Sequence, residues 1–129
     1  MTTWASEELN KIGSAEELKI AALRPDGTLR KQVIIWVVRL GDDLYVRSVK
    51  GHNGAWFRGV LERHQGHIQA GGIDRDVTFV EETAPDINAQ IDAAYRTKYR
   101  RYGPNIVNSI VSPDARTATI KLVPRPTSS

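Results

Sequence analysis

The chain has 129 residues, of which 40% are apolar and 26% charged, and its formal net charge is +3. That size and balance are typical of one globular domain with a core of its own and exclude general disorder, while the absence of cysteine excludes disulfides, thiolate nucleophiles and cysteine-bound zinc. No apolar run approaches the roughly 20 residues that cross a bilayer and no signal peptide begins the chain, so we expect a cytoplasmic protein without membrane contact.

Short elements joined by turns are predicted for the first 50 residues. A helix is expected over 6–13, capped by Ser6 and ended by Gly13. Strands follow over 18–23, 33–38 and 44–49, separated by turns at 24–27 and 41–43. The segment 33–38 is apolar on both faces, as in a strand that is buried on both sides. Hairpin after hairpin favours an antiparallel meander.

The second half mixes helices and strands. The spacing predicts a helix over 55–64, two strands around the glycines at 71 and 72, and a long helix that begins at 83–86 with Thr83 as its cap. Gly103-Pro104 ends that helix, a turn is expected at 112–114, and a last strand at 117–123. The pattern indicates an α+β fold over residues 1–124, with a small, mainly antiparallel β-barrel of about six strands, two to three helices outside it, and a disordered tail at 125–129.

The segment Arg47–Arg58 holds the best candidate site. A strand ends there in a loop that carries Arg47, Ser48, Lys50 and Gly54, and a helix then begins. The start of a helix offers unpaired N–H groups, glycine allows close approach, and cations add counter-charge. The sequence therefore predicts a cradle for the phosphate or carboxylate of a small ligand, to which Arg30 and Lys31 could add charge. The alternative is a loop whose charges only face solvent.

Other side chains were weighed for chemistry. Trp56 could stack on a planar ligand or pack in the core, and core packing is favoured for Trp36. His52 is a candidate for ligand contact, whereas the histidines lack the spacing of a metal site. No catalytic residue is assigned, because there is no nucleophile elbow, Walker motif or dinucleotide fingerprint. Basic and acidic residues are interspersed, which disfavours nucleic acid as a partner.

Three sequence segments show a family resemblance that extends over residues 4–124. They are Val46-Arg47-Ser48-Val49, Gly54-Ala55-Trp56-Phe57-Arg58-Gly59 and Ala94-Tyr95-Arg96-Thr97-Lys98-Tyr99. With them the chain resembles the uncharacterised domain-of-unknown-function family 2255. That resemblance implies no particular activity.

A more distant resemblance links the chain to split β-barrel proteins that bind flavins or deazaflavins, including nitroreductase, quinone reductase and pyridoxamine phosphate oxidase types. Gly27-Thr28-Leu29-Arg30 leads into the apolar segment 33–38, and a strand ending in Ser48 precedes Gly54 and the Trp56-Phe57 pair, as in those proteins. Their Asn-Leu after that pair is Arg58-Gly59 here. The resemblance implies a split barrel, a homodimer, and FMN or a deazaflavin as cofactor. The resemblance implies that Arg30, Lys31, Arg47, Ser48 and Lys50 hold the cofactor phosphate. With His52, Gly54, Trp56 and Arg58 of the candidate segment, they are the predicted cofactor-binding residues.

Two functions remain open at this stage. The first is a flavin- or deazaflavin-dependent oxidoreductase, in which the cofactor performs the redox step and the protein binds and orients it. The second is a ligand-binding or structural barrel without redox activity. Whether the protein is an enzyme is therefore not decided by its sequence.

Overall fold

The computed structural model describes residues 3–125, and in them it has seven β-strands, five α-helices and two short 3₁₀-helices. In chain order these are α1 (Ser6–Ser14), β1 (Leu18–Ala22), β2 (Val33–Ile35), β3 (Val37–Leu40), β4 (Asp43–Arg47), η1 (Gly51–Asn53), α2 (Ala55–Arg63), β5 (Gln65–Ala70), β6 (Ile73–Glu81), α3 (Pro85–Lys98), η2 (Arg100–Tyr102), α4 (Pro104–Ile110), α5 (Pro113–Thr117) and β7 (Thr119–Pro124). The predicted α+β barrel is confirmed, with seven strands instead of about six and more helices than expected.

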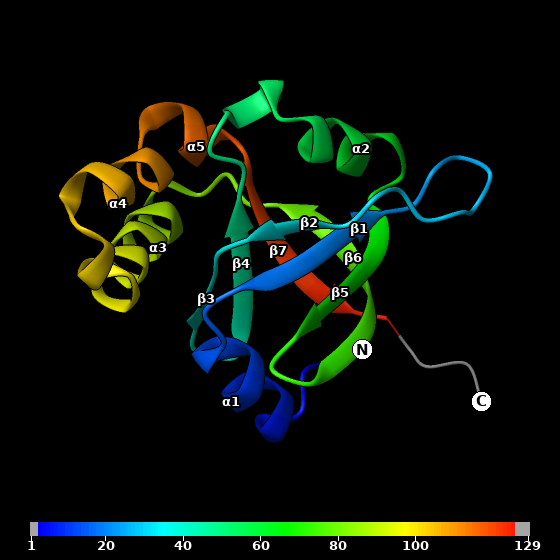
Figure 1. The fold of residues 1–129 in the computed structure, drawn as a ribbon, viewed down its shortest axis with the longest axis horizontal. Helices are drawn as coiled ribbons and strands as arrows, with labels where there is room; N and C mark the ends of the chain where they lie inside the picture. Colours follow the sequence, from blue (N-terminus) through cyan, green and yellow to red (C-terminus); the bar gives the residue numbers. More distant parts are fainter. Residues whose placement is uncertain (1–2, 126–129) are drawn as a thin grey trace.

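The strands form one antiparallel sheet that rolls into a nearly closed barrel. Their order is β2-β1-β5-β6-β7-β4-β3. The two strands at the edges of this order, β2 and β3, follow each other in the chain with one residue between them, so the chain itself joins the two edges (Figure 1). The predicted meander is wrong, because β1 pairs with β5 and β4 pairs with β7, and both pairings cross long stretches of chain.

The expected single strand over 33–38 is broken at Trp36. The α3 side chains take the place of a neighbouring strand there: the Tyr95 hydroxyl donates to the Trp36 carbonyl at 3.2 Å, and the Val37 N–H donates to the Tyr99 hydroxyl at 3.2 Å. The Lys98 ammonium donates to the Val37 carbonyl at 2.6 Å. These bonds satisfy the Trp36 carbonyl and both backbone groups of Val37 at the point where the chain leaves one edge of the sheet and joins the other.

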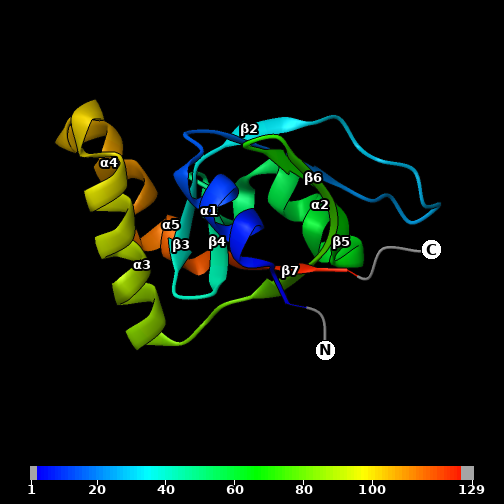
Figure 2. The same ribbon diagram turned by 90° about the horizontal axis from the view of Figure 1, so that it is seen from below.

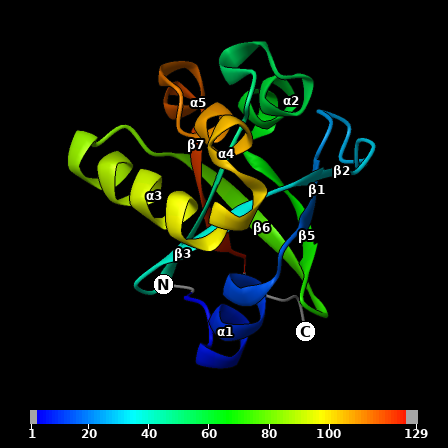
Figure 3. The same cartoon turned by 60° about the vertical axis from the view of Figure 1, so that its left-hand side comes forward.

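Helices cover both ends and one side of the barrel. Helices α1 and α2 lie at opposite ends (Figures 1 and 3), whereas α3, α4 and α5 gather on the side of β3 and β4 (Figure 2). The segment between β1 and β2 extends beyond the barrel as an arm (Figure 1). None of the helices within residues 3–125 is long and apolar enough to cross a membrane.

Two hydrophobic clusters hold these layers together. The larger one fills the barrel and includes Ile20, Leu44, Phe57 and Phe79, all of them buried. The second cluster lies where α3 and α4 pack on β3 and β4, with Tyr95 among its fully buried members. The helical side of the barrel therefore has a core of its own, which fixes the position of α4 beside the loop that follows β4.

Several predicted boundaries differ from the structure. The N-caps of α1 and α3 are Ala5 and Ala84, not Ser6 and Thr83. In α1 the Glu8 carboxylate accepts the Ala5 N–H at 3.0 Å, and in α3 the proline at the first position favours a start there. Gly13 does not end α1, which continues to Ser14.

The C-terminal third holds elements that the sequence analysis missed. The segment predicted as connection and turn forms α4 and α5, each beginning with a proline at its first position. The Ser112 hydroxyl caps α5 by accepting the Ala115 N–H at 3.1 Å. Of the predicted disordered tail, Arg125 donates its N–H to Asp76 at 2.9 Å, and residues 126–129 lie outside the described residues.

Candidate functional site

The loop after β4 is shaped by two glycines. Gly51 has φ +61°, and a side-chain carbon there would lie 2.8 Å from the Asp114 carbonyl oxygen, so only glycine allows η1 to pack this closely on α5. The Gly51 N–H donates to the Ser48 carbonyl at 2.9 Å, and the Gly54 N–H donates to the Gly51 carbonyl at 3.2 Å. The chain therefore turns tightly from the end of β4 into the start of α2.

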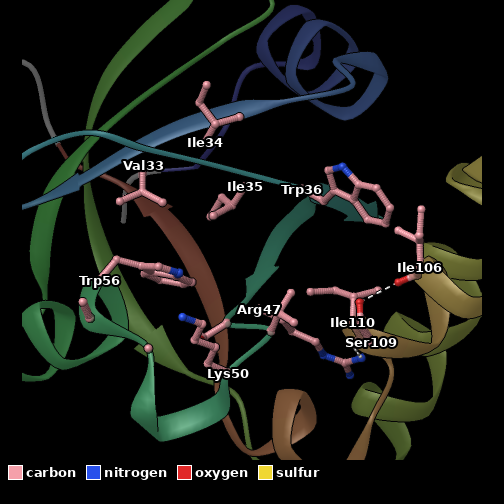
Figure 4. A pocket seen from close by; sticks show the side chains of 14 residues that line it. Val33, Ile34, Ile35, Trp36, Arg47, Lys50, Trp56, Ile106, Ser109 and Ile110 are labelled. Atoms are coloured by element: carbon pink, nitrogen blue, oxygen red, sulfur yellow. Dashed lines mark hydrogen bonds between the residues drawn. The ribbon is translucent and has the colours of Figure 1, made fainter.

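A cavity of about 440 Å³ opens beside this loop (Figure 4). Its walls come from β2 and the bend after it, from the loop after β4, from the start of α2, and from α4. The lining residues are Val33, Ile34, Ile35, Trp36, Arg47, Ser48, Val49, Lys50, Gly54, Ala55, Trp56, Ile106, Ser109 and Ile110. The size is in the range of small-molecule sites, and a mostly apolar wall with few polar groups is their usual composition.

The polar corner of the cavity lies where Ser48 faces the start of α2. Ser48 is 1% exposed, it lines the cavity, and no hydrogen bond joins its hydroxyl to another described residue. The first intrahelical bond of α2 runs from Arg58 to Gly54, and the N-cap Gly54 has no side chain. The N–H groups of residues 55–57 are thus left without acceptors in the helix. Lys50 is exposed and adds a positive charge at this corner.

Arg47 reaches the cavity with its stem, but its guanidinium is bound within the protein. It forms a buried ion pair with Asp92, donates to Thr119 Oγ1 at 2.9 Å and to Asn88 Oδ1 at 2.9 Å, and lies 3.3 Å from the Ile110 carbonyl. Asp92 also pairs with Arg116. Figure 4 shows the guanidinium turned towards α4, away from Lys50 and Trp56. This network joins the end of β4 to α3, α5 and β7.

Two tryptophans form aromatic walls. The Trp36 ring stacks on the Tyr99 ring with centroids 4.0 Å apart and an interplanar angle of 4°. This contact with Tyr99 fixes the orientation of the Trp36 ring. Trp56 is half-buried and meets Phe57 edge-on at 6.1 Å. The Phe57 ring itself is fully buried in the barrel. Trp56 is therefore the ring at the start of α2 that a ligand can contact.

The other predicted site residues do not line this cavity. Arg30 forms an ion pair with Glu62, and its Nε is buried without a partner. Lys31 and Arg58 are exposed, and their side chains form no hydrogen bond or ion pair with the described residues. His52 is exposed, lies 3.0 Å from the Thr117 carbonyl through Nε2, and touches Phe57 edge-on. Of the nine predicted residues, the cavity thus brings together Arg47, Ser48, Lys50, Gly54 and Trp56.

Sequence analysis missed the contribution of α4. Ile106, Ser109 and Ile110 line the cavity from this helix. The Ser109 hydroxyl is already used, since it donates to the Ile106 carbonyl at 2.6 Å. A proline directly after Gly103 and apolar residues at helical spacing were the available signal for a second helix there.

The rim of the cavity is apolar. Five large apolar side chains of the described residues are strongly exposed, and three of them line this cavity: Ile34 at 57%, Val49 at 51% and Ile106 at 52%. They come from β2, the loop after β4 and α4, and so surround the opening from three elements. A cluster of this kind is a common mark of an interaction surface.

The cavity contains no evident acid–base machinery. None of its lining residues is an aspartate, glutamate, histidine or tyrosine. Within residues 3–125, no group of three or more histidine, aspartate or glutamate side chains is arranged to hold a metal ion. The groups that the site offers to a ligand are its hydroxyl, the amides at the start of α2, the Lys50 cation and its aromatic walls.

Comparison with known proteins identifies a family. Residues 8–122 match the family model described as "Uncharacterized protein conserved in bacteria (DUF2255)". The match covers nearly the whole chain and agrees with the resemblance stated from the sequence. A comparison with curated proteins gives no match.

Solved structures share the fold at low identity. A conserved hypothetical protein from Mycobacterium tuberculosis superposes with a TM-score of 0.70 and 10% identity, over 97% of this chain and 83% of the other. A putative pyridoxamine 5′-phosphate oxidase from Listeria innocua gives 0.65 and 13%, over 93% and 92%. A protein described as an F420 reductase gives 0.56 and 17%, over 93% of both chains. At these identities the likeness shows the fold alone, and it confirms the split-barrel resemblance.

Proposed function

The chain belongs to the DUF2255 family, and from the geometry of its cavity we propose that it binds a phosphate-bearing planar cofactor, FMN or a deazaflavin, between Ser48 and Trp56. The class of cofactor is suggested by solved structures of similar fold, one of which is described as an F420 reductase. The proposed place of binding is argued from the residues that line the cavity.

The position of the Ser48 hydroxyl at the cavity is the main support for this proposal. The Ser48 side chain is 1% exposed and lines the cavity, and its hydroxyl forms no hydrogen bond with the residues that the structure describes, so it is available to a ligand beside the amides at the start of α2. A phosphate oxygen can accept from the hydroxyl and from the amides, while Lys50 supplies the counter-charge. Arg47 supports this corner indirectly, because its network fixes the end of β4 from which Ser48 projects.

The remaining walls suit a flat, mostly apolar ring system. Ile35, Val49 and Ile110 provide aliphatic surface, and Trp56 provides an aromatic face beside the phosphate corner. When bound, a flavin or deazaflavin would supply hydride transfer, and this chain would contribute binding, orientation and exclusion of water. On this basis we propose an oxidoreductase.

A binding protein without redox activity is the second candidate. The observation in its favour is the absence of any titratable acid or base among the lining residues other than Lys50 and the internally paired Arg47. The two candidates share the ligand and differ in turnover. An assay of the cofactor-loaded protein with a reductant and an acceptor quinone distinguishes the two functions. Steady consumption of the reductant supports the enzyme, and no consumption supports the binding protein.

We also propose that the protein acts as a homodimer with the cavity at the contact between copies. The exposed Ile34, Val49 and Ile106 surround the opening, and a second copy would cover them. Such a contact would close the mouth of the cavity over a bound ring. It would also explain why a well-folded domain leaves this much aliphatic surface in water at one place.

Titration of the purified protein with FMN and, separately, with coenzyme F420 tests the binding proposal. Saturable quenching of cofactor fluorescence with a micromolar dissociation constant is the expected result for one of them. Riboflavin, which has the ring without the phosphate, is the matched control and should bind at least tenfold more weakly. If neither cofactor binds at 100 µM, on the order of weak non-specific affinity, the proposal falls.

A further inference from the structure

A second hollow lies between α3, β3 and the end of α1. It has a volume of about 560 Å³, and its apolar lining comes from Val38, Leu40, Ala93 and Ala94. Lys98 stands at one end of this groove. The groove shares no lining residue with the cavity described above, so it is a separate feature of the surface.

Lys98 differs from the other five lysines of the chain in its surroundings. Lys11 and Lys121 have carboxylate partners, Glu7 at 3.0 Å and Asp43 at 3.6 Å. Lys19, Lys31 and Lys50 are exposed to solvent. Lys98 is half-buried, and no carboxylate of the described residues lies within 4.0 Å of its amine. Within residues 3–125 its single hydrogen-bond acceptor is the Val37 carbonyl at 2.6 Å.

The charged and titratable groups around Lys98 do not compensate its charge. Arg39, on β3, lines the same groove and donates to Asn10 Oδ1 and to the Gly41 carbonyl, each at 2.8 Å. The Tyr99 ring lies 5.1 Å from the Lys98 Nζ, and its hydroxyl donates to the Glu16 carbonyl at 2.7 Å. The Glu16 carboxylate pairs with Arg101. No ion pair therefore offsets the free-energy cost of removing the Lys98 ammonium from water.

We propose that Lys98 is an acylation site, at which the amine takes an acyl group from a thioester or an acyl phosphate and the groove holds the acyl chain. In this step the unprotonated amine attacks the acyl carbonyl and a C–N bond forms. The C–S or C–O bond to the leaving group breaks, the thiolate or phosphate departs with the electron pair, and the nitrogen loses a proton to solvent. No redox partner is needed.

Two properties of the site favour this chemistry. Burial lowers the pKa of Lys98 to about 8, so at pH 7.5 about a quarter of it is the nucleophilic amine, against about 0.1% for an ordinary lysine. The product also fits: an amide N–H still has a hydrogen to donate to the Val37 carbonyl, while the uncompensated charge is gone. A short aliphatic acyl chain would lie on Val38, Leu40, Ala93 and Ala94.

Competition among the lysines of the unmodified protein tests the proposal without any variant. The folded protein is treated at pH 7.5 with acetyl phosphate or with the acetyl and hexanoyl thioesters of N-acetylcysteamine, each at limiting concentration, and modified peptides are quantified by mass spectrometry. We expect Lys98 to be acylated at least tenfold faster than Lys19 and Lys31, and the preference to grow with the hexanoyl chain. If Lys98 is preferred only with acetyl phosphate or only with the thioesters, that result identifies the class of acyl donor. Equal or slower labelling of Lys98 overturns the acylation site, and no gain from the longer chain overturns the role of the groove.

A pair of variants checks the electrostatic cause. Ala94 lies one helical turn before Lys98 and lines the groove. Ala94→Glu places a carboxylate near the amine and should lower the labelling of Lys98 at least threefold relative to Ala94→Gln, which has the same shape without the charge. Equal labelling in both variants would show that the missing counter-charge is not the cause. Unfolding curves confirm beforehand that both variants are folded.

Discussion

The hydroxyl oxygen of Ser48 occupies the space beside Gly54 that a side chain at position 54 would need. A side-chain carbon built on Gly54 would lie 2.3 Å from Ser48 Oγ, which is far inside van der Waals contact. The backbone of Gly54 has φ −66°, which every residue adopts readily. Glycine is therefore required here by the position of the hydroxyl and not by the conformation of the chain.

Gly54→Ala should displace the hydroxyl and damage the polar corner of the cavity. We expect cofactor affinity to fall about tenfold, as for loss of one hydrogen bond to a charged group, and the free energy of unfolding to fall by about 1–3 kcal/mol from overpacking. Fluorescence titration and urea unfolding measure the two effects.

Ser48→Ala and Ser109→Ala are the matched pair for that experiment. Ser48→Ala should reproduce the loss of affinity with little change in stability, because its hydroxyl has no protein partner. Ser109→Ala should leave affinity unchanged, because that hydroxyl is bonded to the Ile106 carbonyl. Equal affinities of both variants would place the phosphate elsewhere.

Lys50→Ala should weaken cofactor binding by about 1 kcal/mol, roughly fivefold, since the ammonium is exposed and partly screened. The difference from the unmodified protein should shrink as salt is raised from 50 to 500 mM, which a titration series at several salt concentrations measures. Lys31→Ala is the control, because Lys31 is equally exposed and does not line the cavity. If both substitutions have the same effect, only the overall charge matters.

Arg47→Met should destabilise the protein strongly. It leaves Asp92 buried with Arg116 as its remaining partner, and breaking a buried ion pair costs about 3–5 kcal/mol. The free energy of unfolding in urea reports the loss. Arg58→Ala, at an exposed position in the same segment, should change it by less than about 0.5 kcal/mol. An Arg47→Met variant with unchanged stability would contradict a supporting role for the network.

Ile106→Glu should convert the proposed dimer to a monomer, because it puts a charge into the apolar rim of the cavity. Sedimentation velocity at several concentrations distinguishes the two states. Leu29→Glu changes a side chain of similar exposure, 46%, that does not line the cavity, and it should leave the association unchanged. A monomeric unmodified protein would itself disprove the dimer.

Lys98 should give the stability a distinct dependence on pH. Its pKa is lowered by burial to about 8 in the folded protein, whereas the unfolded chain keeps the ordinary value of 10.5. Below pH 8 both states carry the proton and the cost of burying the charge is complete. Between pH 8 and 10.5 only the unfolded state remains protonated, so the cost disappears as the pH rises and the protein becomes more stable.

Comparison with Lys98→Met isolates this contribution. The variant should be more stable than the unmodified protein at pH 7, and the difference should decline towards pH 10. The Val37 carbonyl loses the Lys98 donor in this variant at every pH, so that loss does not alter the trend with pH. Urea unfolding at pH 7, 8.5 and 10 tests the sign; a difference that is constant over this range would rule out a lowered pKa at Lys98.

The sequence predicted the class of fold because its signals are local. The alternation within 18–22 and 73–79 and the helical spacing after Ala55 arise from neighbours in the chain, and the structure places elements there. The break at Trp36 could not be predicted in this way, because the groups that satisfy its backbone come from α3, about 60 residues later. The same holds for the order of the strands, which depends on pairings between distant segments.

The structure brings together part of the predicted site, and for the same reason. Ser48, Lys50, Gly54 and Trp56 lie within one short stretch, and the structure gathers them at one cavity. Arg47 belongs to that stretch, yet the acceptors that hold its guanidinium are Asn88, Asp92 and Thr119, which no local pattern connects to it. The wall from α4 was missed because Gly103-Pro104 was interpreted only as the end of α3 and not also as the start of a further short helix.

The covalent joint at Trp36 limits how the barrel can respond to a ligand. In an open sheet the two edge strands have no direct link to each other, but here one residue joins them, and its carbonyl accepts a hydrogen bond from Tyr95 of α3. A molecule that enters the cavity can change the angle at this joint and cannot lengthen it. Trp36 lines the cavity, and Val38 and Leu40 of β3 line the groove. The joint therefore connects a wall of the cavity to a wall of the groove within one short stretch of chain.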